Sequence, residues 1–407
     1  MIKTVLNPVI RILSVLFLSF FILSTSGYAL NTVKGYNFHI LLIIPIFFHI
    51  VYSFSLQKSI TKFDLKFKIY LFFLILIFIS FILNQNGDYI LKNIKLIIIL
   101  TFSLIFVKNI KFNIFLKYYI VILKLIIIIS LFGYVLVNYF DYASIFDKVS
   151  NVNEVHYLNG YIFFAIEGFG DYMNVGFDRN IGVFWEPGLF ATFILIGFIF
   201  ELIFKEKTSK FTFLIFTIGL ISTKSTFGYL YLFFMIFLLY KKPSFSMILF
   251  LFLFFMLFIY NIDLILSKLV DFNPKMFSKF INDSNSLTER IDSPITNLKI
   301  FFENPFFGSG IGAMDNIYST MTKSNQTSTL TYFLGALGFF VIIPYYYFII
   351  GVLKSKNIRN TFNKLFFIIS FFVFINKEPH TFITITYILM FYFIDPITNK
   401  LSSDIVC

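Results

Sequence analysis

The stretch YLFFLILIFISFIL, residues 70 to 83, contains no charged side chain. A second stretch of the same character, SMILFLFLFFMLFIY, occupies residues 246 to 260. Apolar runs of this length predict helices that cross a lipid bilayer. Over all 407 residues, 58% are hydrophobic and 13% are charged, whereas about a quarter of the residues in a soluble domain are charged. The sequence therefore predicts a polytopic membrane protein.

We expect an all-α polytopic fold with about twelve transmembrane helices. The N-terminal apolar stretch is too long for a signal peptide and has no convincing cleavage site, so it is interpreted as the first span. The expected spans are residues 9–30, 37–56, 67–84, 90–107, 113–137, 186–204, 211–222, 225–240, 244–262, 328–353, 361–376 and 380–395.

Basic residues are concentrated in alternate turns between these spans. Such turns lie on the cytoplasmic side of a membrane, which predicts that both termini are cytoplasmic. The net charge of +12 is then a signal for orientation and for anionic lipid headgroups, so a nucleic-acid partner is not expected. The basic turns are residues 57–68, 108–117, 205–210, 241–242 and 354–364.

Two long polar segments then fall on the extracytoplasmic side, and they divide the chain into five parts. Loops of this length are usually functional or disordered, and these contain aromatic residues and Gly–Pro turns, so we expect them to be folded. The parts are residues 1–137 (five spans), 138–185 (first outer loop), 186–262 (spans with a short helix pair), 263–327 (large outer loop with an amphipathic helix) and 328–407 (last spans and cytoplasmic tail).

The short helix pair is predicted because STKST, residues 222 to 226, interrupts an apolar run at 211–240. Each half is too short to cross a bilayer, and a polar tip inside the membrane is tolerated where it lines a wet cavity or is buried in protein. Lys224 would then face inward, where an ionisable side chain is a candidate functional group. The alternative is that Lys224 snorkels to the outer interface.

Cysteine and histidine are too few and too scattered for a metal centre. The single Cys is residue 407, and the four His form no H-x-x-H pair. Neither a disulfide, a metal site nor a cofactor is therefore expected.

The segment RNIGVFWEPG, residues 179 to 188, immediately precedes an apolar span. Pro187 suits the first turn of a helix, and the carboxylate of Glu186 complements the helix dipole there. Trp185 fits the aromatic belt at the outer interface. A capped, anchored helix explains these residues but leaves Arg179 unexplained.

Arg290 lies in the second outer loop, upstream of the glycine series GSGIG at residues 308 to 312. Bare backbone amides at Gly308 and Gly310 could receive an anionic oxygen. Arginine forks bind phosphate oxygens in pairs, so Arg179, Arg290 and Lys224 could converge on one lipid diphosphate. The alternative is that each Arg pairs with a loop carboxylate, Asp178 or Asp292.

Four stretches, in this order along the chain, resemble the bacterial O-antigen and capsule repeat-unit polymerases of the O-antigen polymerase and ligase superfamily. Residues 179–188 resemble their Arg-x-x-Gly-x-x-x-Glu-Pro segment, and STKSTFGYL (222–230) resembles their polar-tipped helix pair. LKIFFENPFFGSGIG (298–312) and SNQTSTLTYFLGALGFF (324–340) resemble the large periplasmic loop and the helix that follows it. The resemblance extends over residues 170–350.

This resemblance implies a GT-C-like, metal-independent glycosyltransferase. It would polymerise undecaprenyl-diphosphate-linked repeat units into O-antigen or capsular polysaccharide at the outer face of the cytoplasmic membrane, beside a flippase and a chain-length regulator. The catalytic candidates are Arg179, Glu186 and Arg290, and the substrate-binding candidates are Lys224, Trp185, Gly308, Gly310 and His380.

Three other functions stay open at this point. An O-antigen ligase typically carries a His where this chain has SNQ at 324–326, although His380 could take its place in space. A lipid-linked oligosaccharide flippase would place charges within its spans. An assembly subunit of an export machine would need neither Arg179 nor Arg290.

Overall fold

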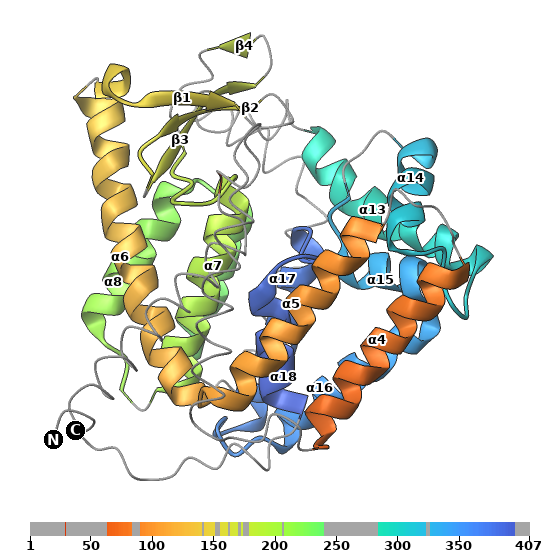
Figure 1. The fold of residues 1–407 in the computed structure, drawn as a ribbon. Helices are drawn as coiled ribbons and strands as arrows, with labels where there is room; N and C mark the ends of the chain where they lie inside the picture. Colours follow the sequence, from red (N-terminus) through yellow and green to blue (C-terminus); the bar gives the residue numbers. More distant parts are fainter. Residues whose placement is uncertain are drawn as a thin grey trace, which may run out of the picture.

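The computed structural model describes residues 29, 63–83, 90–140, 142–150, 155–161, 163–169, 172–173, 179–205, 207–239, 284–322 and 326–394. This part of the chain is mainly helical, with one small sheet (Figure 1). The helices are α4 (Leu65–Leu83), α5 (Ile90–Asn109), α6 (Phe112–Tyr139), α7 (Pro187–Ile199), α8 (Lys210–Ser222), α9 (Thr226–Leu239), α13 (Ser284–Glu303), α14 (Ile311–Met321), α15 (Thr329–Leu337), α16 (Ile342–Lys354), α17 (Thr361–Lys377) and α18 (Thr384–Ile394). Shorter helical turns are η3 (Tyr142–Ile145), η4 (Phe200–Phe204) and η5 (Phe339–Val341).

Four of the described helical stretches are long and apolar enough to cross a membrane. They are Leu65–Ile82, Ile90–Asn109, Phe112–Tyr139 and Pro187–Phe204. Membrane-spanning helices are thus supported, and the number twelve stays a prediction. The expected spans at 9–30, 37–56 and 244–262 lie outside the described residues, apart from Ala29.

The expected long span at 328–353 is interrupted. Gly338 has a φ of +78° and separates α15 from η5 and α16. Its position is tightly packed, because a Cβ atom there would lie 2.1 Å from the carbonyl oxygen of Phe306. The break therefore follows from a close approach between this turn and the chain after α13.

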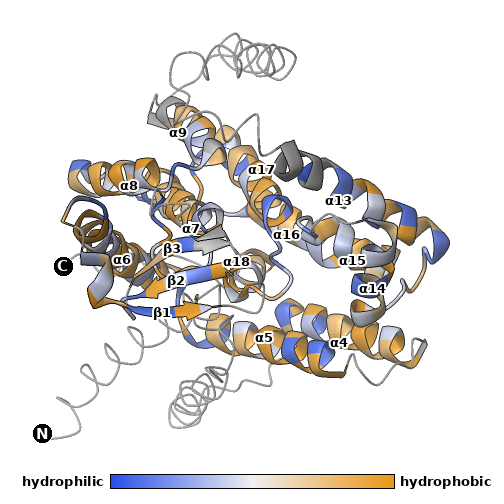
Figure 2. Ribbon diagram, turned by 90° about the horizontal axis from the view of Figure 1, so that it is seen from above, coloured by the Kyte–Doolittle hydropathy of each residue, from blue (hydrophilic) through white to orange (hydrophobic). Residues whose placement is uncertain are grey.

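The first outer loop folds into a sheet, which corrects the expectation of an all-α chain. Strands β1 (Asp147–Ser150), β2 (Val155–Asn159), β3 (Phe164–Phe169) and β4 (Tyr172–Met173) pair antiparallel in the order β1-β2-β3-β4. The sheet lies over the ends of α6 and α7 (Figures 1 and 2). It is anchored at β2, where Tyr157 and Leu158 are fully buried.

The second outer loop contains the amphipathic helix α13 and the short helix α14. On α13, Asn297 and Ile300 are buried whereas Ile295 and Phe302 are exposed, as expected for a helix with one face against the protein. This is the amphipathic helix that the sequence predicts within residues 263–327. The face that contains Asn297 packs on α15.

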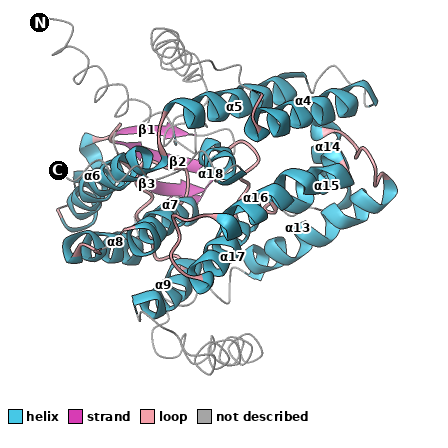
Figure 3. Ribbon diagram, turned by 90° about the horizontal axis from the view of Figure 1, so that it is seen from below, coloured by secondary structure: helices cyan, strands magenta, loops and turns pink. Residues whose placement is uncertain are grey.

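Helices α7 and α18 form the centre of the molecule. Every residue of α7 and of α18 is buried, and Figure 3 shows the other helices arranged around them. A helix that is hydrophobic on all sides is stable only when it is surrounded in this way. The N-terminus of α7 is therefore a central position at the end of the molecule that bears the sheet.

Candidate functional site

Glu186 is the residue that immediately precedes α7, and its backbone is extended, with φ −151° and ψ 156°. Pro187 occupies the first turn of the helix, as expected. The side chain of Glu186 does not cap the helix by a hydrogen bond. Its carboxyl group interacts electrostatically with that of Glu378. Glu186 thus occupies the N-cap position of α7, as the sequence predicts, but its side chain makes no capping hydrogen bond.

Lys377 and Glu378 form the end of α17, and the ammonium group of Lys377 is held from three directions. Its Nζ atom donates to the carbonyl oxygen of Gly188 at 3.0 Å and lies 3.2 Å from Glu378 Oε1. It also lies 4.6 Å from the centre of the Phe227 ring on α9. Both Lys377 and Glu378 are buried, so these contacts are little screened by water.

Gly188 makes this approach possible. A Cβ atom at position 188 would lie 2.5 Å from Glu378 Oε1 and 3.2 Å from Lys377 Nζ. The first of these distances is too short for any side chain. In the sequence Glu-Pro-Gly, Glu186 therefore provides a carboxyl group and Pro187 begins the helix. The missing side chain of Gly188 leaves room for the carboxyl group of Glu378.

Arg290 reaches the same cluster from α13. Its Nη2 atom lies 3.8 Å from Glu378 Oε1, and its side chain is 40% exposed. This is a loose contact, in which the guanidinium group remains open to solvent. Of the two alternatives for Arg290, the structure shows a carboxylate partner, but one from α17 rather than Asp292.

Buried hydrogen bonds place α13 against the end of α17. Ser293 Oγ accepts from the backbone amides of Thr327 at 3.0 Å and Ser328 at 3.2 Å. Ser328 Oγ in turn donates to Asn376 Oδ1 at 2.7 Å. Ser293 is three residues from Arg290, and Asn376 is two residues from Glu378. This chain of contacts therefore determines where Arg290 meets Glu378.

The four charged side chains make a distinctive electrostatic centre, here called the Glu–Lys–Arg cluster: Glu186, Arg290, Lys377 and Glu378. The pKa of Glu186 is raised well above its usual value, first by burial and then by the neighbouring charge of Glu378. Lys377 and Arg290 oppose this increase. Groups from α13 and from the end of α17 therefore influence the carboxyl group at the start of α7.

Arg179 and Lys224 meet at a second place, the turn between α8 and α9. Arg179 Nε donates to the carbonyl oxygen of Thr223 at 3.1 Å, and Lys224 follows in a left-handed conformation with φ +46°. A positive φ is uncommon for a residue with a side chain. Phe227, which lies beneath Lys377, is three residues from Lys224. The turn therefore borders the Glu–Lys–Arg cluster, while Arg179 and Arg290 contact different elements. Asp178 lies outside the described residues.

Trp185 connects the sheet to α7. Its carbonyl oxygen accepts a hydrogen bond from the hydroxyl of Tyr157 at 3.0 Å, and its side chain is partly buried against the core. Its position beside Glu186 is compatible with the predicted contact to substrate, which stays a prediction.

Gly308 and Gly310 do not present free amides, and the expectation of an anion site there is corrected. The amide of Gly308 donates to the carbonyl of Asn304 at 3.0 Å, and that of Gly310 donates to Ala336 at 2.9 Å. A Cβ atom on Gly308 would lie 2.3 Å from the backbone of Ala336. These glycines allow the chain after α13 to pack on the end of α15.

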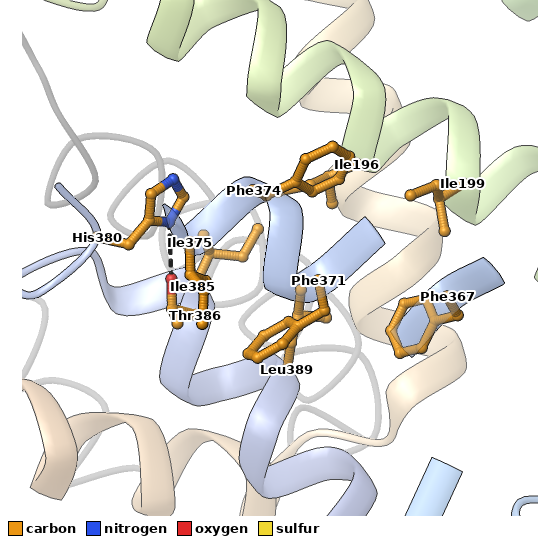
Figure 4. Close-up of a pocket in the computed structure, with 10 residues that line it drawn as sticks. All are labelled: Ile196, Ile199, Phe367, Phe371, Phe374, Ile375, His380, Ile385, Thr386 and Leu389. Atoms are coloured by element: carbon orange, nitrogen blue, oxygen red, sulfur yellow. Dashed lines mark hydrogen bonds between the residues drawn. The ribbon is translucent and has the colours of Figure 1, made fainter. Parts of the chain in front are cut away.

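His380 is also unsuited to the substrate-binding role that was expected. It is 1% exposed, its Nδ1 atom lies 2.9 Å from Thr386 Oγ1, and it borders an apolar cavity of about 20 Å³ (Figure 4). Burial lowers the pKa of His380 to about 4. The imidazole is therefore enclosed by the protein rather than exposed beside the Glu–Lys–Arg cluster.

Lys377 and Glu378 are the members of the cluster that sequence reasoning missed. A signal was present, because Glu-Pro occurs twice, at 186–187 and at 378–379, each time beside an apolar span. The paired motif would have identified both carboxyl groups.

Among the described residues, no group of three or more His, Cys, Asp or Glu side chains is arranged to hold a metal ion. No protein-family model, curated protein or solved structure matches this chain.

Proposed function

We propose that this protein is a glycosyltransferase that polymerises undecaprenyl-diphosphate-linked oligosaccharide repeat units into O-antigen or capsular polysaccharide. The proposal places the protein in the cytoplasmic membrane, with both termini in the cytoplasm and the reaction on the outer face. A flippase and a chain-length regulator would be its partners.

The observation that best supports this proposal is the convergence of the Glu–Lys–Arg cluster. Its members come from the start of α7, from α13 and from the end of α17. They meet at the end of the helices that bears the sheet, which is the expected outer side. A lipid-linked substrate would present its diphosphate at that depth, beside the glycan.

The chemistry requires two things that this region can supply. In the transfer, a sugar hydroxyl of one repeat unit forms a bond to the anomeric carbon of the other glycan, and the bond from that carbon to the diphosphate oxygen breaks. The leaving diphosphate keeps the bonding electrons, so cations stabilise it. Arg290 is the exposed cation of the cluster. Arg179 contacts the α8–α9 turn, which contains Lys224 and leads to Phe227 beside Lys377.

The hydroxyl must also lose its proton, and a carboxyl group of raised pKa is suited to accept it. A base acts best when its pKa lies near the working pH. Glu186 is partly exposed and lies at the start of α7, beside the Lys377 contact to Gly188. It is the substrate-facing base in this proposal.

The test is reconstitution of the purified protein in liposomes with synthetic undecaprenyl-diphosphate-linked repeat units, with the products separated by size. A ladder of lengths is expected. Transfer only to an added lipid A–core acceptor would instead indicate a ligase. Movement of the substrate across the bilayer without a new glycosidic bond would indicate a flippase.

Two variants connect that activity to the site. Arg290→Ala should abolish the ladder, and Arg290→Lys should restore it only in part, because Lys keeps the charge and loses the fork. A full ladder from Arg290→Ala would contradict the assigned role and would favour a site elsewhere.

A further inference from the structure

Four phenylalanine side chains are exposed where the chain leaves α13 and where η5 begins. They are Phe302 (74% exposed), Phe306 (67%), Phe307 (41%) and Phe339 (53%), and they are here called the aromatic patch. The two parts of the patch adjoin, because the amide of Phe339 donates to the carbonyl oxygen of Pro305 at 2.7 Å. Exposed apolar side chains gathered in this way mark a surface that contacts a partner or a membrane.

Hydrogen bonds place the turn after α13 at a definite height along α4. The amide of Gly310 donates to the carbonyl oxygen of Ala336 at 2.9 Å, and Ser80 Oγ donates to the same oxygen at 3.2 Å. Ser80 belongs to Leu65–Ile82, the stretch of α4 that is long and apolar enough to cross a membrane. The turn after α13 therefore lies beside the last part of that stretch rather than beyond its end.

The aromatic patch also continues the exposed apolar face of the helix that follows it. Phe339–Lys354 is a shorter apolar helix, and its exposed large apolar side chains are Phe339, Ile342, Tyr346 and Leu353. Their spacing places all four on one face of the helix. In a chain with membrane-spanning helices, the hydrocarbon of the bilayer is the medium that covers such a face.

The backbone of the turn meets the condition for entering a membrane. Irregular chain is tolerated at that depth where the protein itself satisfies the polar groups of the backbone. The amides of Gly308, Ser309 and Gly310 donate to backbone carbonyl oxygens at 2.8 to 3.0 Å. The side-chain amide of Asn304 donates to Ser309 Oγ at 3.4 Å. These groups therefore do not need water.

Helix α13 has the side chains of a helix that lies in the membrane interface. Its exposed side carries the apolar Ile295 and Phe302 and the charged Lys299 and Glu303. A helix of this kind places its apolar side chains at the boundary between headgroups and acyl chains, and a lysine there extends its charged end to the headgroups. Arg290 precedes Phe302 by a helical length of roughly 18 Å.

We propose that the aromatic patch is inserted among the acyl chains of the expected outer leaflet, so that residues 302–310 form a re-entrant turn. The partner is the hydrocarbon of the phospholipids, at the height that the hydrogen bond from Ser80 of α4 defines. The insertion anchors one end of α13, while the other end carries Arg290 to the Glu–Lys–Arg cluster. The bilayer thus contributes to the position of Arg290, and this contact does not depend on the proposed transferase activity.

Tryptophan fluorescence of the full chain in proteoliposomes tests the insertion. Trp185 is the only tryptophan, so Trp185→Phe provides a background into which Phe306→Trp or Phe339→Trp is introduced. In phospholipids brominated on the acyl chains near the headgroup, both variants should lose most of their emission, because bromine quenches tryptophan on contact. Iodide in the water should quench them little. The two positions lie in the two parts of the patch, so the test stays decisive if one substitution prevents folding.

The matched control is Ser319→Trp in the same background, at an exposed position on α14. It should be quenched by iodide and not by the brominated lipid. Quenching of the patch variants by iodide alone would place the patch in water. Quenching by neither agent would show that protein covers the patch, for example a second copy of this chain. Either result would overturn the insertion, whereas absence of a product ladder would count against the transferase proposal alone.

Discussion

The Nζ atom of Lys377 donates a hydrogen bond of 3.0 Å to the carbonyl oxygen of Gly188, across a sequence separation of 189 residues. This contact joins the end of α17 to the first turn of α7. It also brings Glu378 beside Glu186, because each Glu adjoins one of the two elements in contact. The position of both carboxyl groups therefore depends on one glycine carbonyl and one lysine.

Gly188→Ala tests that dependence. The new methyl group would lie 2.5 Å from Glu378 Oε1, so the Glu378 carboxyl group must move and its contacts with Lys377 and Arg290 must change. We expect polymerising activity to be lost on the order of 10²-fold, as for loss of an acid–base group. The matched control is Gly197→Ala in the same helix, whose methyl group would meet Leu123 and Phe216. It should lower the melting temperature while the protein that remains folded stays active. Equal activity in the two variants would contradict the prediction.

The raised pKa of Glu186 predicts how stability depends on pH. The folded protein binds this proton more tightly than the unfolded chain does, so the stabilisation is complete below the usual carboxyl pKa and is lost as pH rises through the folded value. Gln in place of Glu186 stays neutral at every pH. The melting temperature of Glu186→Gln minus that of wild type, measured in detergent micelles, should therefore increase with pH. A difference that does not vary with pH would show that Glu186 is ionised in the folded protein.

Arg179→Lys should reduce activity even though the charge is kept. Lysine has no Nε–H group at the place from which Arg179 donates to the carbonyl of Thr223, and it cannot bind two phosphate oxygens in a fork. We expect a loss of roughly tenfold or more, since a hydrogen bond from a charged group contributes about 1.5–3 kcal/mol. Arg359→Lys, at an exposed position before α17, is the control in the same ladder assay. Full activity of Arg179→Lys would refute the role of the fork.

Gly338→Ala should be among the most destabilising single changes in this chain. The residue has a φ of +78°, and an added Cβ atom would lie 2.1 Å from the carbonyl oxygen of Phe306. Strain of about 1–3 kcal/mol is expected from the backbone conformation alone, and the clash adds to it. Thermal unfolding of the variant in micelles should show a lower midpoint than wild type without any substrate present. An unchanged midpoint would contradict the packing described for this turn.

The helices could be predicted from the sequence because apolar runs and turn residues are local signals. The predicted span at 113–137 corresponds to α6, and the predicted break at 222–226 corresponds to the turn between α8 and α9. Pro187 correctly located the first turn of α7. The sheet at 147–173 was not predicted, since its short strands depend on pairing with one another and on burial of Tyr157 against the core.

By itself, the sequence determined that the chain is helical and apolar, and it located the start of α7. It also identified Glu186 and Arg290 as charged residues close to apolar segments. Only the tertiary structure decided that Lys377 and Glu378 lie against the first turn of α7 and that Gly308 and Gly310 serve packing. The physical reason is the distance along the chain over which each interaction acts. Helix formation and capping depend on residues within a few positions, whereas the electrostatics of a buried carboxyl group depend on which distant charges the fold places within a few ångströms of it.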